Sequence, residues 1–141
     1  MVANKLISCG VQKGDVVATF MYNSLEQALI WFGCAKMGAI YAPLNVSLVR
    51  DDLAYSLNDT GAKLFILDEE LAPAYNAAKT LLTLHPRVFV LGNTGSIENN
   101  AAECFEDLTT GDDTLPDIEI KSTDPMAIVY TGGSTSMPKG V

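Results

Sequence analysis

The chain ends in a segment that combines glycines, hydroxyl side chains and a lysine. Residues 130–141 read YTGGSTSMPKGV. Glycines allow the backbone to turn its amide groups toward an anion, and hydroxyl groups add further hydrogen-bond donors. The lysine adds a mobile positive charge. This combination predicts a phosphate-binding loop, whose candidate residues are Gly132, Gly133, Ser134, Thr135, Ser136 and Lys139.

The loop does not follow the Walker A pattern. That pattern requires G-x-x-x-x-G-K-[ST], whereas here Pro138 precedes Lys139 and Gly140 follows it. Pro138 fixes its own φ angle and pushes the preceding residue toward an extended backbone, so the lysine leaves a stiffened segment. We therefore expect a different kind of phosphate loop. From the loop alone, a Gly/Ser-rich tail without a ligand remains an alternative.

The charge balance excludes one class of partner. Nine Lys and Arg against 17 Asp and Glu give a formal net charge of −8, and no basic cluster interrupts the acidic background. Nucleic acid is therefore an unsuitable partner. A small anionic ligand needs local donors to bind, and each donor to a charged phosphate oxygen contributes about 1.5–3 kcal/mol.

The cysteines and the apolar segments indicate a cytoplasmic location. Three cysteines lie far apart and form no paired motif, as is typical of reduced thiols: Cys9, Cys34 and Cys104. The apolar run at residues 28–44 is interrupted by a lysine, a glycine and a proline, so we expect no transmembrane segment. His85 has no neighbouring ligand set, and we interpret it as a turn residue; no metal site is predicted.

Helix and strand patterns alternate along the first two thirds of the chain. Ser24 and Gln27 match a capping box, and Gly38 supplies a helix stop. The strand runs are short and apolar, which is typical of parallel strands covered on both faces. The expected helices are 2–9, 24–37, 51–57 and 73–84, with a turn at 58–61; the expected strands are 16–21, 39–42, 63–67 and 87–91.

These patterns predict an α/β fold in three stretches. Residues 1–91 form the α/β units, residues 92–123 form a long surface connection, and residues 124–141 form a strand at 126–131 followed by the loop. Within the connection, AAECFEDL is a possible short helix. Trp31, Phe32 and Cys34 are expected in the core, and the Asn45 side chain is expected to bond to local backbone.

The terminal segment resembles the signature of the adenylate-forming superfamily, whose usual form is Y-T-S-G-T-T-G-x-P-K-G-V. Three upstream blocks are similar, in the same order, to the N-terminal blocks of AMP-forming acyl-CoA ligases: GVQKGDVVATFMYNS, WFGCAKMGAIYAPLN and LAYSLNDTGAKLFI. The resemblance covers essentially the whole chain. It implies an α/β fold that is part of the large N-terminal domain of such an enzyme.

In that family the loop acts as a flexible clamp over the β- and γ-phosphates of ATP while a carboxylate attacks the α-phosphate. The positions that match the usual pattern are Thr131, Gly133, Thr135, Pro138 and Lys139. The positions that differ are Gly132, Ser134 and Ser136. The resemblance thus adds Thr131 to the candidate phosphate-binding residues.

The resemblance also implies an activity. The parent enzyme is expected to use ATP, Mg²⁺ and coenzyme A to convert a carboxylic acid, with a fatty acid expected, into an acyl adenylate and then a thioester. The adenine-binding segment, the magnesium-binding acid and the catalytic lysine are expected downstream, so these 141 residues alone are expected to be inactive. The alternatives are a non-catalytic degenerate homologue or interaction fragment, and an amino-acid adenylation domain.

Overall fold

A five-stranded parallel sheet forms the centre of the molecule. The computed structural model describes residues 1–100, 102–131 and 139–141. Every neighbouring pair in the sheet is parallel, and the strand order is β2-β1-β3-β4-β5. The predicted α/β fold with parallel strands is confirmed. The strands are β1 Val16–Phe20, β2 Ile40–Pro43, β3 Leu64–Asp68, β4 Arg87–Leu91 and β5 Ala102–Cys104.

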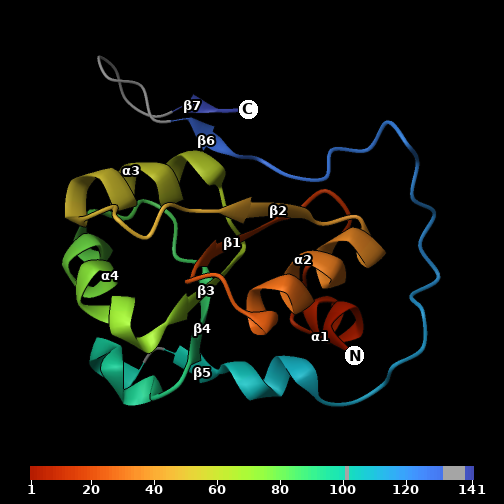
Figure 1. The fold of residues 1–141 in the computed structure, drawn as a ribbon, viewed down its shortest axis with the longest axis horizontal. Helices are drawn as coiled ribbons and strands as arrows, with labels where there is room; N and C mark the ends of the chain where they lie inside the picture. The colour runs from red at the N-terminus through yellow and green to blue at the C-terminus, as the bar shows by residue number, and fades with distance from the viewer. Residues whose placement is uncertain (101, 132–138) are drawn as a thin grey trace.

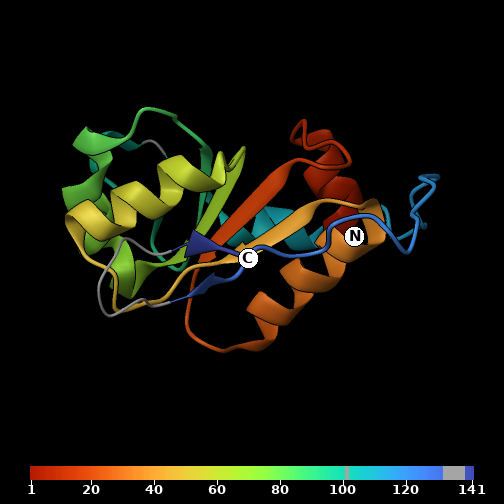
Figure 2. The ribbon, with the colours of Figure 1, turned by 90° about the horizontal axis from the view of Figure 1, so that it is seen from above.

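Helices cover both faces of the sheet (Figures 1 and 2). The helices α1 (Val2–Ser8) and α2 (Leu25–Met37) lie on one face, while α3 (Arg50–Thr60) and α4 (Ala72–Ala78) lie on the other. Short 3₁₀ helices extend the connections: η1 Glu69–Leu71, η2 Lys79–Leu81, η3 Thr94–Ser96, η4 Glu98–Asn100 and η5 Phe105–Thr109. In the described part of the chain, no helix has both the length and the apolar character needed to cross a membrane.

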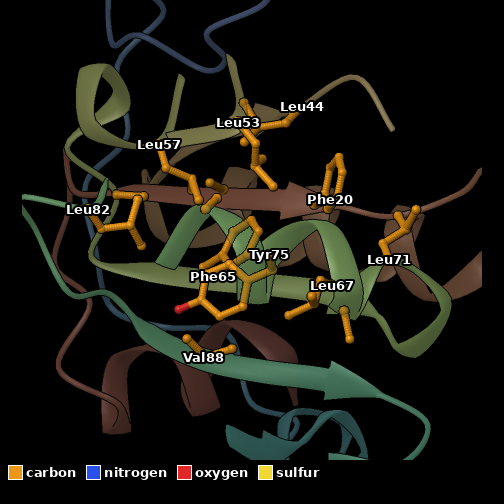
Figure 3. Packing of buried hydrophobic residues seen from close by; sticks show 14 of the residues in the cluster. Phe20, Leu44, Leu53, Leu57, Phe65, Leu67, Leu71, Tyr75, Leu82 and Val88 are labelled. Atoms are coloured by element: carbon orange, nitrogen blue, oxygen red, sulfur yellow. The ribbon is translucent and has the colours of Figure 1, made fainter. Parts of the chain in front are cut away.

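The core follows the two-residue period of the strands. On β3, Phe65 and Leu67 pack on the α3–α4 side, whereas Leu64 and Ile66 pack on the α1–α2 side. Phe65 lies 5.2 Å, between ring centroids, from Tyr75 of α4 (Figure 3). Burial on both faces explains why the strands carry continuous apolar runs rather than alternating ones.

The cap of α2 at Ser24 and its stop at Gly38 are confirmed, but the Gln27 half of the predicted capping box does not form, because the Gln27 side-chain amide donates to the Met21 carbonyl at 3.5 Å instead. The Ser24 hydroxyl accepts a hydrogen bond from the Gln27 amide at 3.1 Å, and Gly38 ends the helix in the left-handed region at φ 73°. The predicted turn at 58–61 is wrong, because α3 continues through it and ends only at Gly61, where φ is 61°. A glycine at this position terminates the helix without the strain that a side chain would cause.

The stretch 92–123 contributes to the sheet and the core, which the sequence did not predict. Within AAECFEDL, the predicted helix is replaced by β5, parallel to β4, followed by η5. Phe105 and Leu108 of η5 are buried on the α1–α2 side, and Ile97 is buried on the other side. A strand of three residues is too short to show an alternating pattern, so the apolar residues after it suggested a helix.

The prediction that Trp31 and Phe32 lie in the core is wrong. Their exposed fractions are 41% and 58%, and their rings stack on each other at a centroid distance of 5.5 Å. The core face of α2 is formed instead by Ile30, Cys34 and Met37. Cys34 is buried as predicted, and this burial raises the pKa of its thiol to about 12.

The C-terminal segment runs along the free edge of β2 before it forms a separate hairpin. The Tyr41 amide donates to the Met126 carbonyl at 3.0 Å, and the Ile128 amide donates to the Tyr41 carbonyl at 2.9 Å. The predicted strand 126–131 is thus an isolated parallel bridge between Ala127 and Tyr41, followed by β6 at Tyr130–Thr131.

Candidate phosphate-binding site

A two-stranded hairpin forms the base of the predicted phosphate loop. Strand β6 pairs in antiparallel fashion with β7 (Lys139–Gly140), and Thr131 faces Lys139. Two residues further from the loop than this pair, the amides of Val129 and Val141 each donate to the other residue's carbonyl, at 2.9 and 3.0 Å. The chain therefore leaves and returns at adjacent points, with residues 132–138 between them.

Two predicted site residues lie in the described part of the structure. Thr131 and Lys139 are both exposed, and the Thr131 hydroxyl donates to the Lys139 carbonyl at 3.4 Å. This distance is long for an O–H···O hydrogen bond, so little is lost when the hydroxyl turns to another acceptor. The other predicted site residues lie outside the described residues: Gly132, Gly133, Ser134, Thr135 and Ser136.

The Lys139 ammonium group is suited to an anionic ligand. The side chain is exposed at the end of the hairpin, and the described residues place no carboxylate within ion-pair distance of it. A lysine binds phosphate as a compact point charge with three donors. An exposed hydroxyl and an exposed ammonium group therefore lie side by side at Thr131 and Lys139, and both can donate to an anion.

Tyr130 ties the hairpin to α3. Its hydroxyl donates to an Asp59 carboxylate oxygen at 2.7 Å. Burial raises the pKa of Tyr130, and the hydrogen bond to Asp59 raises it further, so the phenol stays protonated and remains a donor. Gly140 lies close to the same ring: a Cβ atom there would be 2.8 Å from Ile128 Cγ2 and 3.4 Å from Tyr130 Cζ.

A hollow of about 390 Å³ lies beside the hairpin, at the carboxyl ends of β1 and β2. Its wall includes Asn23, Gln27 and Asn45 together with Tyr130. Ligands of open α/β sheets commonly bind beyond the carboxyl ends of the strands, and this volume is within the range of small-molecule sites. The Asn45 side chain accepts a hydrogen bond from the Ser47 amide at 2.9 Å, as predicted.

A second hollow, of about 380 Å³, lies at the carboxyl ends of β3 and β4 and is strongly acidic. Its acidic lining residues are Asp68, Glu69, Glu70 and Glu106. Burial raises the pKa of Asp68, and the charges of Glu70 and Glu26 add to this effect. Four carboxyl groups oppose a phosphate here, so the charge pattern favours the hairpin as the phosphate site.

The described residues contain no group of three or more His, Cys, Asp or Glu side chains that could hold a metal ion. The sequence did not indicate two residues that lie close to Tyr130, namely Asp59 and Gly140. Asp59 lies in the stretch interpreted as a turn, and no local pattern connects it to a residue 71 positions later. Gly140 directly follows Lys139 in the sequence, but its close approach to the Tyr130 ring appears only in the fold.

The whole sequence, residues 1–141, matches the family described as "AMP-binding enzyme". It is 36% identical to a crotonobetaine/carnitine–CoA ligase from Citrobacter koseri, over 99% of this chain and 27% of the relative. It is 33% identical to the long-chain-fatty-acid–CoA ligase FadD13 from Mycobacterium tuberculosis, over 99% of this chain and 26% of the relative.

Solved structures show the same likeness. The anthranilate CoA ligase AuaEII, in complex with anthranoyl-AMP, gives a TM-score of 0.89 at 28% identity, covering 99% of this chain and 27% of that one. A Mycobacterium tuberculosis fatty acyl CoA synthetase gives 0.75 at 30% identity, again covering 99% and 27%. The chain spans about a quarter of the length of these relatives. The resemblance predicted from the sequence is confirmed, and the chain belongs to the AMP-binding enzyme family.

Proposed function

We propose that this chain is part of a longer ATP-dependent, AMP-forming acid–CoA ligase. Such an enzyme activates a carboxylic acid as an acyl adenylate and then transfers the acyl group to coenzyme A. The observation that carries the proposal is the likeness, over 99% of the chain, to proteins whose names share CoA ligation: a carnitine, a fatty-acid and an anthranilate ligase.

The role of this chain in the reaction is to hold the phosphates of ATP. Lys139 supplies a positive charge and Thr131 a hydroxyl donor at the two ends of the loop. The remaining predicted contacts are Gly132, Gly133, Ser134, Thr135 and Ser136. Magnesium, when bound with ATP, neutralises further phosphate charge. Positioning and charge stabilisation of this kind supply most of the acceleration in phosphoryl-type chemistry.

The substrate we propose is a fatty acid, and the proposed location is the cytoplasm. One curated relative is a long-chain-fatty-acid–CoA ligase, which supports this substrate class. The three cysteines are free thiols in the structure, which suits a reducing compartment.

We further propose that the 141 residues alone are inactive and bind ATP weakly. The described residues supply one wall of a site, and fixing the loop around a phosphate costs about 1–2 kcal/mol of backbone entropy per residue. Calorimetric titration of MgATP into the purified chain measures this directly. Weak or undetectable binding is expected, and micromolar affinity would contradict the proposal.

Pyrophosphate release by the full-length protein tests the proposed activity. The assay uses MgATP with a panel of acids, from short to long aliphatic chains, together with amino acids, and is run with and without coenzyme A. Release that depends on a fatty acid and continues to a thioester supports the proposal. Release with amino acids alone would instead indicate an adenylation domain. If a folded protein releases no pyrophosphate with any acid, the result would indicate a non-catalytic homologue. The differences from the family loop pattern at Gly132 and Ser136 motivate this alternative.

A further inference from the structure

We propose that Asp59 is a positioning residue for the nucleotide site, acting through Tyr130. The carboxylate on α3 holds the phenol, and the phenol holds the strand that carries Thr131 and pairs with Lys139. This inference rests on the proposed function and extends it, because it assigns a role to a residue outside the loop and its flanking motif.

The helix α3, which carries Asp59, is held in place by core packing and by hydrogen bonds at its C-terminal end. Leu53 and Leu57 bury the helix against the sheet. At its C-terminal end, the Asn58 side chain donates to the Leu81 carbonyl at 3.1 Å and accepts from the Thr83 amide at 2.8 Å. The neighbouring Thr60 hydroxyl donates to the Leu57 carbonyl at 2.7 Å. Asp59 therefore lies in the last turn of α3, between two residues whose side chains are hydrogen-bonded.

The hairpin itself has few attachments. Strands β6 and β7 have two residues each, and Figure 1 shows them beside α3 and outside the main sheet. The preceding residues bridge to Tyr41 on β2, and Ile128 and Tyr130 pack partly on the core. Among the residues that the structure describes, Tyr130–Asp59 is the only side-chain hydrogen bond from the hairpin to the rest of the protein.

The contact indicates that Asp59 acts by positioning the hairpin and not by attracting the ligand through its charge. A negative charge near a phosphate site is unfavourable in itself, so Asp59 is not placed there to attract the nucleotide. What it provides is an acceptor at 2.7 Å for the Tyr130 hydroxyl. Because an asparagine carbonyl oxygen can accept the same bond, Asp59→Asn should keep the function, whereas Asp59→Ala should lose it.

The first test uses steady-state kinetics of the full-length protein. Asp59→Ala and Tyr130→Phe should each raise the KM for ATP about 5-fold, equivalent to about 1 kcal/mol at 1.4 kcal/mol per tenfold change. The KM values for the acid and for coenzyme A should stay within about 2-fold of the wild type. The double variant should be no worse than either single one, because both remove the same bond.

Two variants serve as controls in the same assay. Asp59→Asn should stay within about 2-fold of the wild-type KM for ATP. Asp52→Ala removes an exposed acid from the first turn of the same helix, away from Tyr130, and should also leave this KM unchanged. Equal effects of Asp52→Ala and Asp59→Ala would reduce the role of Asp59 to helix stability and overturn the proposal.

The second test requires no activity. Hydrogen exchange of the peptide at 129–141 should be faster in Asp59→Ala and Tyr130→Phe, because the paired amides of Val129 and Val141 open more often, while exchange in β3 and β4 stays unchanged. Unchanged exchange in both variants overturns the positioning role. If exchange is faster in the variants but the full-length protein releases no pyrophosphate, the proposed function is refuted, whereas the role of the Asp59–Tyr130 contact in holding the hairpin is supported.

Discussion

Thr131 and Lys139 face each other across the antiparallel pair β6–β7. This pairing places a hydroxyl donor and an ammonium group at the two ends of the predicted phosphate loop, on a hairpin anchored to α3. The two residues can therefore act on one group of phosphates from opposite ends of the loop. Their positions depend on the fold around residues 126–130 as much as on the loop sequence.

Removing the Lys139 charge should weaken the use of ATP. In the full-length protein, Lys139→Ala should lower kcat/KM for ATP about 10- to 100-fold, because a hydrogen bond to a charged group contributes about 1.5–3 kcal/mol. Lys139→Arg keeps the charge and should retain part of the activity. Pyrophosphate release measures both. Lys5→Ala on α1 is the control, and an effect as large from this variant would argue against a specific role.

Gly33 should be intolerant of a side chain because α1 crosses α2 at this point. A Cβ atom at Gly33 would lie 2.5 Å from Val2 Cγ1. Overpacking of a core costs about 1–3 kcal/mol, which exceeds the gain of about 1 kcal/mol in helix propensity from Gly33→Ala. Urea unfolding should therefore show a net loss of about 1 kcal/mol. In a Val2→Ala background the Cγ1 contact is gone and only the contact with Val2 Cβ at 3.0 Å remains, so the same substitution should cost less than in the wild type. An equal loss there would show that the Cγ1 clash is not the cause.

The N-cap of α2 should contribute measurably to stability. Ser24→Ala removes the acceptor for the Gln27 amide and should lower the free energy of unfolding by about 1 kcal/mol. Ser24→Asn, which can cap the helix in the same way, should cost much less. The comparison is made by urea unfolding, with Ser47→Ala as an exposed control. Equal losses for Ser24→Ala and Ser24→Asn would mean that capping is not responsible.

Asp15 should stabilise the protein at neutral pH. Partial burial acts to raise the pKa of Asp15, but hydrogen bonds from Lys63 and the Gln12 amide outweigh it, so the pKa lies below its usual value. The stabilisation is present above the unfolded pKa of about 3.9 and is lost as the pH falls through the lower folded pKa. Asp15→Asn should thus cost about 0.2–1 kcal/mol at pH 7, typical of exposed ion pairs, and little in strong acid.

Asp68 should show the opposite pH dependence. Its pKa is raised, mainly by burial and also by the charges of Glu70 and Glu26, so ionisation disfavours the folded state. This penalty is present above the folded pKa and disappears as the pH falls below about 3.9. Asp68→Asn should therefore be more stable than the wild type at pH 7, with an advantage that shrinks on acidification. Urea unfolding at several pH values would contradict this if the advantage grew in acid.

The sequence predicted the elements whose signals are local. Ser24, Gly38 and the apolar strand runs each report on neighbouring residues, and the structure confirms them. Local signals failed where a distant partner decides the outcome. Residues 102–104 form a strand because β4 offers a free edge, and Trp31 is exposed because the core face of α2 is already formed by Ile30, Cys34 and Met37.

The candidate site was also predictable from the sequence only where the signals are local. The residue types of the loop indicated phosphate chemistry, and the structure brings Thr131 and Lys139 together as strand partners. The contact between Asp59 and Tyr130 joins residues 71 positions apart, so no spacing pattern could indicate it. Only the packing of α3 against the sheet brings the carboxylate within reach of the hairpin.

Isotope transfer from the acid to AMP tests the central claim most directly. When a carboxylate oxygen attacks the α-phosphorus of ATP, pyrophosphate leaves and that oxygen bridges the acyl group and AMP. Attack of the coenzyme A thiol on the carbonyl then releases AMP that retains the oxygen. With a fatty acid labelled with ¹⁸O in both carboxylate positions, mass spectrometry of the full-length reaction should find one ¹⁸O in AMP. Label in inorganic phosphate, or unlabelled AMP from a reaction that makes thioester, would contradict an acyl-adenylate route.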